Sequence, residues 1–425
     1  MFRGEIMEKN NSYNRRVVVT GMGAVTPIGN TLAEYWHGLK SGKNGIAPIT
    51  HFDAARFKVR IAAEVKGFDP CLFMDRKEAR RMDPYSQYAV AASAMAYADA
   101  GLNDENIGDR LRFGVMIGAG IGGLGTIEEQ CVRLAQKGPD RIDPMYIPKA
   151  IGNIAAGNAA IKVGAHGVCA SVVAACSTGA NSIGEAYRYI KHGYADAMIA
   201  GGAEAPVTPT GVGGFAALTA LAETDDCGRA SIPFDKDRKG FVIGEGAGVL
   251  VLESLDRALA RGAQIYCEIA GYGATCDAYH MTAPDPEGAY AAEAMRLAMR
   301  EANAAPDKVG YINAHGTSTP LNDVMETRAI KLALGEYAKS VSISSTKSMT
   351  GHSLGAAGAI EAIACVMAIK DSFVPPTIGL QNEDPECDLD YTKGAGRARD
   401  IEYALSNSNG FGGHNTVLCF KKYMA

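Results

Sequence analysis

One cysteine of the chain stands at a position where a nucleophile can be activated. Cys176 lies in the segment AACSTG, between a β-branched run and the helical pattern of residues 181–190. The unpaired amides and the macrodipole at the start of a helix favour negative charge, so this position predicts a lowered thiol pKa and a nucleophilic thiolate. The alternative is a buried structural cysteine, which is how we expect most of the ten cysteines to behave.

Two histidines occupy matching contexts in the second part of the chain. His315 follows a predicted strand at 310–313 and opens the loop HGTSTP, and His352 ends the segment STKSMTGH before an Ala- and Gly-rich helix that carries Glu361. Strand ends in α/β sheets are where functional sites gather. A structural histidine bonded to a nearby carbonyl is the alternative for each, but the paired contexts favour a shared role.

Two further features could support a charged reaction intermediate. Lys347 precedes His352 by five residues, where it could hold the carboxylate of Glu361 or raise the local positive potential. The run SNSNGFGGHN at 406–415 is a glycine-rich turn whose amides could bind an oxyanion. A surface lysine and a tight hairpin are the respective alternatives.

A compact group of cations lies earlier in the chain. Lys77, Arg80 and Arg81 fall at i, i+3 and i+4, so they share one face if the segment is helical. This spacing predicts either a docking spot for an acidic partner or a solvated helix face.

Several cofactor classes are disfavoured by the motifs. The segment GAGIGG at 118–123 satisfies the dinucleotide pattern GxGxxG, but no strand ending in Asp or Glu follows about 20 residues later. The chain has no GxxxxGK[ST], HExxH or CxxC motif. We therefore expect no cofactor and no metal.

Composition describes an ordinary globular enzyme. The 425 residues are 47% hydrophobic with a formal net charge of -5, and no apolar run reaches the ~18 to 20 residues that span a membrane. A soluble, cytoplasmic protein is expected, with neither nucleic acid nor membrane as a partner. Residues 1–15 are polar and patternless, which predicts a flexible N-terminal tail.

The elements that must position these residues alternate along the chain. β-branched runs, such as 17–19 and 249–252, are separated by Ala-rich stretches of helical period, which is typical of a layered α/β fold.

Three pairs of segments also follow one another in the same order: 15–30 with 266–280, 113–123 with 310–320, and 172–190 with 344–363. They suggest two copies of one unit meeting near residue 262, with chance similarity among Gly- and Ala-rich segments as the alternative.

From about Arg16 to Lys422 the chain closely resembles β-ketoacyl-acyl carrier protein synthases of the elongating, synthase II type. The motifs that carry the resemblance, in order, are CSTG at 176–179, GEGAG at 244–248, HGTST at 315–319, KSMTGH at 347–352 and GFGG at 410–413. Two departures from the commonest pattern, LND at 321–323 and His414, leave the motifs themselves intact.

The resemblance implies a thiolase-like α/β fold of two duplicated halves in a five-layered αβαβα arrangement, usually as a homodimer. The half at 16–262 would supply Cys176, and the half at 263–425 would supply His315 and His352. Cys176 would take an acyl chain from acyl carrier protein, and both histidines would then stabilise the enolate formed as malonyl-carrier protein loses CO2.

Supporting roles also follow from the resemblance. Lys347 and Glu361 would form an ion pair, Phe411 would gate the acyl channel, and the amides of Cys176 and Phe411 would form an oxyanion hole. Thr317 and Thr319 would bind the substrate's pantetheine arm, and Thr282 would also bind the substrate. Lys77, Arg80 and Arg81 match positions that dock the carrier protein.

Three competing functions remain open at this point. A polyketide ketosynthase shares the same three catalytic residues. A non-catalytic chain-length partner lacks the nucleophile, so the presence of Cys176 argues against it. A degradative thiolase needs a second cysteine in a glycine turn, whereas Cys419 lies in the predicted strand 416–421.

Overall fold

The structure is a computed structural model that describes residues 14–424. Most of the predicted tail, residues 1–13, lies outside the described residues.

Ten strands form one sheet in two sets of five. The first set comprises β1 (Val17–Val25), β4 (Phe113–Gly118), β5 (Cys169–Ala170), β6 (Ala197–Glu204) and β7 (Gly246–Ser254). The second comprises β8 (Cys267–Cys276), β9 (Val309–Asn313), β10 (Ser342–Ser344), β13 (Tyr403–Gly410) and β14 (His414–Lys421).

The two sets have the same strand order. Outward from the centre, one half of the sheet runs β1, β7, β6, β4, β5 and the other runs β8, β14, β13, β9, β10. The pairings agree as well: β1–β7 and β8–β14 are antiparallel, and β4–β6 and β9–β13 are parallel. The two halves meet where β1 pairs with β8 from Val17 to Val19. The duplicated architecture that the sequence predicts is therefore confirmed.

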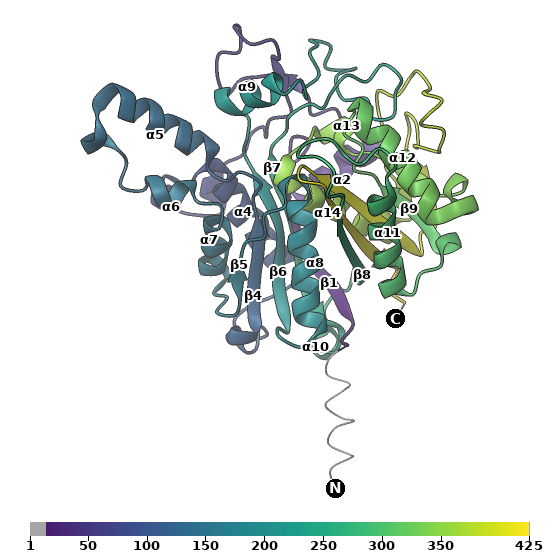
Figure 1. Cartoon of the computed structure of the whole chain (residues 1–425). Helices are drawn as coiled ribbons and strands as arrows, with labels where there is room; N and C mark the ends of the chain where they lie inside the picture. Colours follow the sequence, from purple (N-terminus) through teal and green to yellow (C-terminus); the bar gives the residue numbers. More distant parts are fainter. Residues whose placement is uncertain (1–13, 425) are drawn as a thin grey trace.

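Helices complete five layers (Figure 1). In Figure 1 α4 (Pro84–Asp99) and α7 (Ile154–Val163) cover the outer face of the first half, and α11 (Ala289–Ala302) and α12 (Pro320–Leu334) cover that of the second. Between the halves lie α8 (Thr178–Lys191) and α14 (Ala357–Asp371), and each contacts strands of both. Every residue of α14 from 357 to 369 is buried, as expected for a helix that is apolar all round.

The remaining helices are short or peripheral. They are α2 (Leu32–Ser41), α3 (Arg76–Ala79), α5 (Leu124–Lys137), α6 (Tyr146–Ala150), α9 (Pro209–Ala217), α10 (Leu255–Ala260) and α13 (Lys347–Thr350). In Figure 1 α5 projects away from the body, with α6 beneath it.

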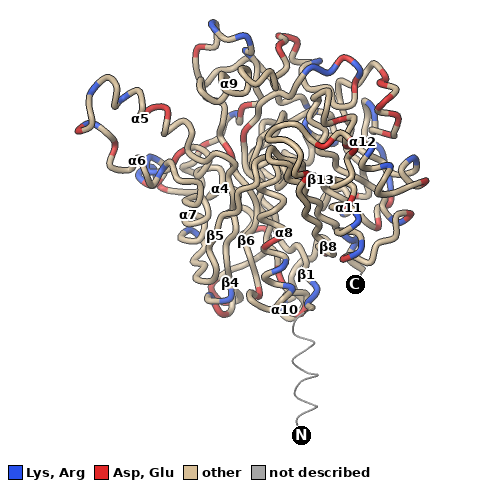
Figure 2. Tube along the Cα trace, in the orientation of Figure 1, with Lys and Arg blue, Asp and Glu red and all other residues tan. Residues whose placement is uncertain are grey.

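Figure 2 shows that Lys, Arg, Asp and Glu gather on the peripheral loops and helices, whereas the strands are largely free of them. Among residues 14–424 no helix combines the length and the apolar character that crossing a membrane requires.

The repeated Gly-x-Gly-Ala of the sequence has a packing role in both halves. A Cβ on Gly23 of β1 would lie 2.1 Å from the carbonyl oxygen of Ala92 in α4. A Cβ on Gly273 of β8 would lie 2.0 Å from the carbonyl oxygen of Ala294 in α11. Real Cβ atoms cannot approach so closely, so each glycine lets an outer helix lie directly on its strand.

Candidate active site

A single cavity of about 370 Å³ brings together most of the predicted site residues. Its wall includes Cys176, His315 and His352, which are far apart in the sequence and come from both halves. The other predicted residues in the wall are Phe411, Thr282, Thr317 and Thr319. Lys347 and Glu361 are buried behind His315, and Lys77, Arg80 and Arg81 are exposed on the surface and do not line the cavity.

Cys176 sits on a strained turn at the start of a central helix. It is the middle residue of the 3-10 turn η5 (Ala175–Ser177), which leads into α8. Ala175, the residue before it, has a φ of 47°. In the other half Leu354 also has a φ of 47° and opens the turn η8 (Leu354–Ala356) before α14. Positive φ is unfavourable for residues with a Cβ, so both turns are held by their surroundings.

The acidity of the thiol differs from the sequence-based prediction. We predicted a lowered pKa from the helix N-terminus, but burial raises the pKa of the Cys176 thiol to about 12. The Lys347 ammonium and a hydrogen bond from the backbone of Phe411 act in the opposite direction and only partly offset burial. The prediction of a lowered pKa is therefore wrong, and any reaction of this sulfur as a thiolate requires that its proton first be removed.

The glycine-rich turn between β13 and β14 lies directly over Cys176. A Cβ on Gly410 would be 3.2 Å from the amide nitrogen of Cys176 and 2.8 Å from the carbonyl oxygen of Ala174. This close approach places the amides of Cys176 and Phe411 at the same side of the cavity. Two such donors can stabilise an oxyanion that forms on a thioester bound to the sulfur.

The two histidine rings lie next to each other in the cavity wall. Their centroids are 5.3 Å apart and their planes are nearly perpendicular, at 87°. Burial, followed by the positive charge of Lys347, holds the pKa of both imidazoles well below the usual range. Both rings are therefore neutral near pH 7, and each can donate one N–H to an oxygen in the cavity.

Lys347 determines which nitrogen of His315 carries the proton. Its Nζ lies 3.4 Å from Nδ1 of His315, donates to the His315 carbonyl oxygen at 2.6 Å, and forms a close ion pair with Glu361. Because an ammonium can only donate, Nδ1 is the acceptor and Nε2 carries the hydrogen. Burial raises the pKa of Glu361 to about 7, an effect that Lys347 opposes.

The backbone of His352 is fixed by a neighbouring extended segment. Its amide donates to the carbonyl oxygen of Val242 at 2.7 Å, and its carbonyl accepts from Gly244 at 2.9 Å. The ring of Phe241 meets the imidazole edge-on, with centroids 5.1 Å apart. The first glycine of the GEGAG motif and the two residues 241 and 242 before it thus hold this histidine.

One buried acid that positions His315 was missed by the sequence analysis. Glu326 of α12 accepts hydrogen bonds from the amides of His315 at 2.8 Å and Gly316 at 2.7 Å. Asn407 of β13 donates to the same carboxylate at 3.2 Å. The available signal was the row of polar residues on a buried helix face, 322, 323, 326 and 327, where apolar residues are expected.

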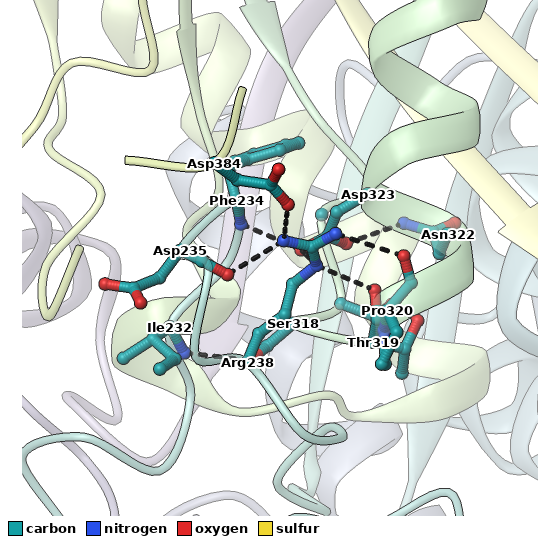
Figure 3. Close-up of polar contacts among 12 residues, drawn as sticks. Ile232, Phe234, Asp235, Arg238, Ser318, Thr319, Pro320, Asn322, Asp323 and Asp384 are labelled. Carbon is teal, nitrogen blue, oxygen red and sulfur yellow. Dashed lines mark hydrogen bonds and ion pairs between the residues drawn. The ribbon is translucent and has the colours of Figure 1, made fainter. Parts of the chain in front are cut away.

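A buried arginine holds the loop that carries the two cavity threonines (Figure 3). Arg238 donates to the carbonyl oxygens of Thr319 at 3.2 Å and Pro320 at 3.1 Å, and it pairs with Asp384 at 2.6 Å. The hydroxyls of Thr317 and Thr319 lie 2.9 Å apart. Asp323, from the unusual segment 321–323, lies 3.6 Å from the arginine and accepts the Phe234 amide. This departure from the commonest sequence pattern therefore belongs to the scaffold of the loop.

The cationic group forms only part of the predicted helix face. The helix α3 ends at Ala79, so Arg80 caps it and Arg81 lies beyond its end. Lys77, Arg80 and Arg81 are all exposed. A helix through residue 81 is the condition for a shared face, and the helix reaches only its cap at Arg80. Arg81 therefore lies outside that face, although all three cations are exposed within five residues of the chain.

Comparisons with known proteins agree with this geometry. Two family models match, "Beta-ketoacyl synthase, N-terminal domain" at residues 14–258 and "Beta-ketoacyl synthase, C-terminal domain" at residues 266–381. Proteins named 3-oxoacyl-[acyl-carrier-protein] synthase 2 are similar over 97% of this chain. The one from Synechocystis sp. is 56% identical, with 99% of its own length covered, and the one from Staphylococcus aureus is 52% identical, with 100% covered.

Solved structures with the same architecture are also similar. A ketosynthase in complex with its type II PKS acyl-carrier protein has a TM-score of 0.90 at 38% identity, covering 97% of this chain and 100% of the other. A β-ketoacyl synthase from Burkholderia phymatum has a TM-score of 0.89 at 37% identity, covering 96% and 100%. These neighbours confirm the predicted thiolase-like ketosynthase fold. With both family models matched and more than half of its residues shared with the synthase from Synechocystis, the chain belongs to the β-ketoacyl synthase family.

Proposed function

We propose that this chain is a 3-oxoacyl-[acyl-carrier-protein] synthase that elongates fatty acyl chains by two carbons in a decarboxylative Claisen condensation. The observation that carries the proposal is the cavity that holds one cysteine thiol and two neutral imidazoles. The relatives that bear this name are 52% and 56% identical, whereas the polyketide ketosynthase in complex with its carrier protein is 38% identical. Fatty acid elongation is therefore favoured over a polyketide pathway.

In the first half-reaction Cys176 accepts the acyl group. The sulfur attacks the thioester carbonyl of an acyl-carrier protein, the new acyl–Cys176 bond forms, and the carrier leaves as a thiol. The thiol proton of Cys176 ends on the departing sulfur, with a neutral imidazole of the cavity available to relay it. The amides of Cys176 and Phe411 stabilise the tetrahedral oxyanion, each contributing about 3 kcal/mol.

In the second half-reaction the histidines act on malonyl-carrier protein. Loss of CO2 leaves an electron pair that is shared with the thioester oxygen as an enolate. The N–H groups of His315 and His352 stabilise that charge more strongly than the ground-state carbonyl. The enolate carbon then attacks the acyl carbonyl on Cys176, the carbon–carbon bond forms, and the carbon–sulfur bond breaks to release a thiolate, which takes up a proton from solvent to restore the Cys176 thiol.

The remaining predicted residues act as supports. Lys347, paired with Glu361, orients His315 and keeps a positive charge behind that ring. Phe411 gates the acyl channel, and its ring faces Phe215 with centroids 6.5 Å apart. The hydroxyls of Thr282, Thr317 and Thr319 meet the polar pantetheine arm of the substrate, since all three line the cavity.

Acyl carrier protein is the proposed partner. It is an acidic protein by the family resemblance, and Lys77, Arg80 and Arg81 offer it three exposed cations. The similarity to a ketosynthase solved with its carrier protein supports this assignment. Steering by these charges would raise the rate of encounter more than the strength of the final complex.

A homodimer is supported by an asymmetry between the two halves. The outer edge of β10 is covered, because Arg397 and Arg399 donate to Ser342 and Ile343 donates to Asp390. In contrast, the corresponding edge strand β5 is flanked by exposed apolar side chains from neighbouring segments. These are Ile161 of α7, the helix that contacts β5, at 79% exposure, and Val173, three residues after the end of β5, at 62%. An open edge with an apolar surround is typical of a self-association surface.

We also propose a cytoplasmic location and the division of labour that the sequence predicts. Residues 16–262 provide the nucleophile, and residues 263–425 provide both histidines. The interleaving of α8 and α14 between the half-sheets explains how two halves share one cavity.

The decisive experiment is condensation by the purified chain. Acyl-carrier proteins of graded length are mixed with malonyl-carrier protein, and released CO2 and the lengthened product are both measured. We expect a 3-oxoacyl product two carbons longer than the acyl donor, with one CO2 per product. Absence of both from a folded protein with active carrier substrates would refute the proposal.

A further inference from the structure

The glycine-rich loop after β4 holds one of the protein's own carboxylates. Glu204, the last residue of β6, is fully buried and accepts hydrogen bonds from the amides of Gly120 at 2.6 Å, Ile121 at 3.1 Å and Gly122 at 3.1 Å. A fourth bond comes from the amide of Gly355 in the other half, at 3.1 Å. The segment that matches a dinucleotide motif is therefore filled by an internal carboxyl group; burial raises its pKa to about 7, and the four amides oppose that rise by favouring the ionised form.

The four amide donors occupy all the acceptor positions of the Glu204 carboxylate. Oε2 accepts from Gly120 and Gly355, and Oε1 accepts from Ile121 and Gly122. A carboxylate has about four acceptor positions and no donor, whereas a glutamine amide would turn an NH2 group toward two of these donors. Buried amides without a partner are costly, so this carboxylate fixes the loop and Gly355 relative to each other.

This carboxylate lies where the two strained turns of the halves meet. A Cβ on Gly120 would lie 3.4 Å from the carbonyl oxygen of Ala175, which precedes the nucleophile. A Cβ on Gly355 would lie 2.3 Å from the amide nitrogen of Gly120, and one on Gly202 would lie 2.3 Å from the Gly355 carbonyl oxygen. Three backbones thus pass at contact distance around Glu204, and one of them carries Cys176.

We propose that Glu204 is the positioning residue for the Cys176 turn. It binds loop 120–122 on one side and Gly355 on the other, so that the positive φ of Ala175 is maintained and the sulfur faces the incoming thioester. Glu204 lies behind the cavity wall and acts only through this backbone. The inference rests on the proposed function, because the step it controls is acyl transfer from carrier protein to Cys176.

Glu204→Gln tests the inference against a matched control, Glu253→Gln. Glu253 is also fully buried on the first half-sheet, but it pairs with Ala197 at the opposite end of β6 and bonds Thr20, Arg257 and Arg261. We expect single-turnover acylation of Cys176 in Glu204→Gln to fall about 10- to 100-fold, as for other displaced reacting groups. The carrier concentration at half-saturation should not change, and Glu253→Gln should acylate at the wild-type rate.

Each result has a defined meaning. A folded Glu204→Gln protein that acylates at the wild-type rate overturns the inference, and so does a rise in half-saturation concentration without a loss of rate. If Glu204→Gln fails to fold, Glu204→Asp keeps the charge but shortens the side chain, and the same two measurements apply to it. Failure of the wild-type protein to be acylated would instead refute the proposed function, which separates the two hypotheses.

Discussion

The ammonium of Lys347 contacts both the ring and the backbone of His315, with Nζ 3.4 Å from Nδ1 and 2.6 Å from the carbonyl oxygen. The same lysine pairs with Glu361, so it connects α14 to the loop that carries the histidine. This arrangement keeps the hydrogen of the neutral ring on Nε2 and keeps a positive charge close to the cavity. The role of Lys347 in orienting His315 explains why its ion pair with Glu361 is fully buried. A buried ion pair contributes little to the stability of the fold by itself.

Replacing Lys347 with Met should impair decarboxylation more than acylation of Cys176. The variant loses the group that selects the His315 tautomer, and it leaves Glu361 buried without its cation. We expect a loss of about 3 kcal/mol in unfolding free energy and a fall of about 10- to 100-fold in CO2 release from malonyl-carrier protein.

The matched control for this prediction is Glu361→Gln, which leaves Lys347 free to hold His315. Urea unfolding and CO2 release are measured for both variants. Equal loss of CO2 release in the two would show that the ion pair, and not the contact with His315, is what matters.

The lowered pKa of both cavity histidines predicts how stability depends on pH. Each imidazole has a folded-state pKa well below the ordinary value of 6.5, so below that pH the unfolded chain binds protons that the folded chain does not. The stability contributed by the neutral rings is present above pH 6.5 and is lost as the pH falls toward the folded-state pKa. Each histidine should contribute on the order of 1 kcal/mol of this loss between pH 7.5 and 5.5.

A variant carrying His315→Asn and His352→Asn removes both groups and serves as the comparison. The unfolding free energy of the wild-type protein should fall by roughly 2 kcal/mol more than that of the double variant over this range. Parallel pH profiles for the two proteins would mean that the rings are not held neutral. Because both rings stay neutral, the wild-type protein should still release CO2 from malonyl-carrier protein below pH 6.5.

Cys176→Ala separates the two half-reactions. Without the sulfur there is no acyl-enzyme, so condensation should be abolished. His315 and His352 remain in the cavity, and malonyl-carrier protein should still release CO2 at a measurable rate. Product formation and labelled CO2 are measured on the same samples. If the folded variant loses both activities, the assignment of decarboxylation to the histidines alone is wrong.

Reversing the charge of Lys77 should affect the encounter with carrier protein and leave the chemistry intact. The side chain is exposed and does not line the cavity. For Lys77→Glu, and more strongly with Arg80→Glu and Arg81→Glu added, we expect a higher KM for carrier-bound substrate, a weaker dependence on salt and an unchanged kcat.

Lys308→Glu is the control for this experiment, because Lys308 is also exposed but lies in the second half, between α11 and β9. Its kinetics should match the wild type at every salt concentration. The docking assignment would be excluded by a set of variants whose KM and salt dependence equal those of Lys308→Glu.

Sequence reasoning identified the residues that lie in local motifs. The segments around Cys176, His315 and His352 could be located because each is a glycine-rich turn between a strand and a helix. The conformation of such a turn depends mainly on residues that are neighbours in the sequence, so the sequence alone can indicate it. The paired segments also predicted the duplicated fold, since Gly23 and Gly273 allow the same helix-on-strand contact in both halves.

What the sequence did not reveal depends on distant partners. Glu326 acts on His315 from the next helix, and Glu204 acts on Gly355 across 151 positions of the chain. The acidity of Cys176 was predicted wrongly because the helix terminus is a local feature, whereas burial depends on how both halves close over the thiol. The end of α3 at Ala79 was likewise not visible in the spacing of the cations.

Gly410 offers a test of the oxyanion hole. An alanine there would place its Cβ 3.2 Å from the amide nitrogen of Cys176 and 2.8 Å from the carbonyl oxygen of Ala174, and neither backbone atom can yield easily. The turn must then move away from the nucleophile and carry the Phe411 amide with it. Loss of one oxyanion donor should slow acylation of Cys176 by about 10²- to 10³-fold.

Gly152→Ala is the matched control for Gly410→Ala, because a Cβ at Gly152 meets no atom within 4 Å. It should acylate at the wild-type rate. In Gly410→Ala the histidines are not displaced, so decarboxylation of malonyl-carrier protein should persist while acylation fails. The alanine Cβ does not allow the turn to keep its present position beside Cys176. If the folded Gly410→Ala protein nevertheless acylates at the normal rate, the thioester oxyanion must be stabilised elsewhere in the cavity.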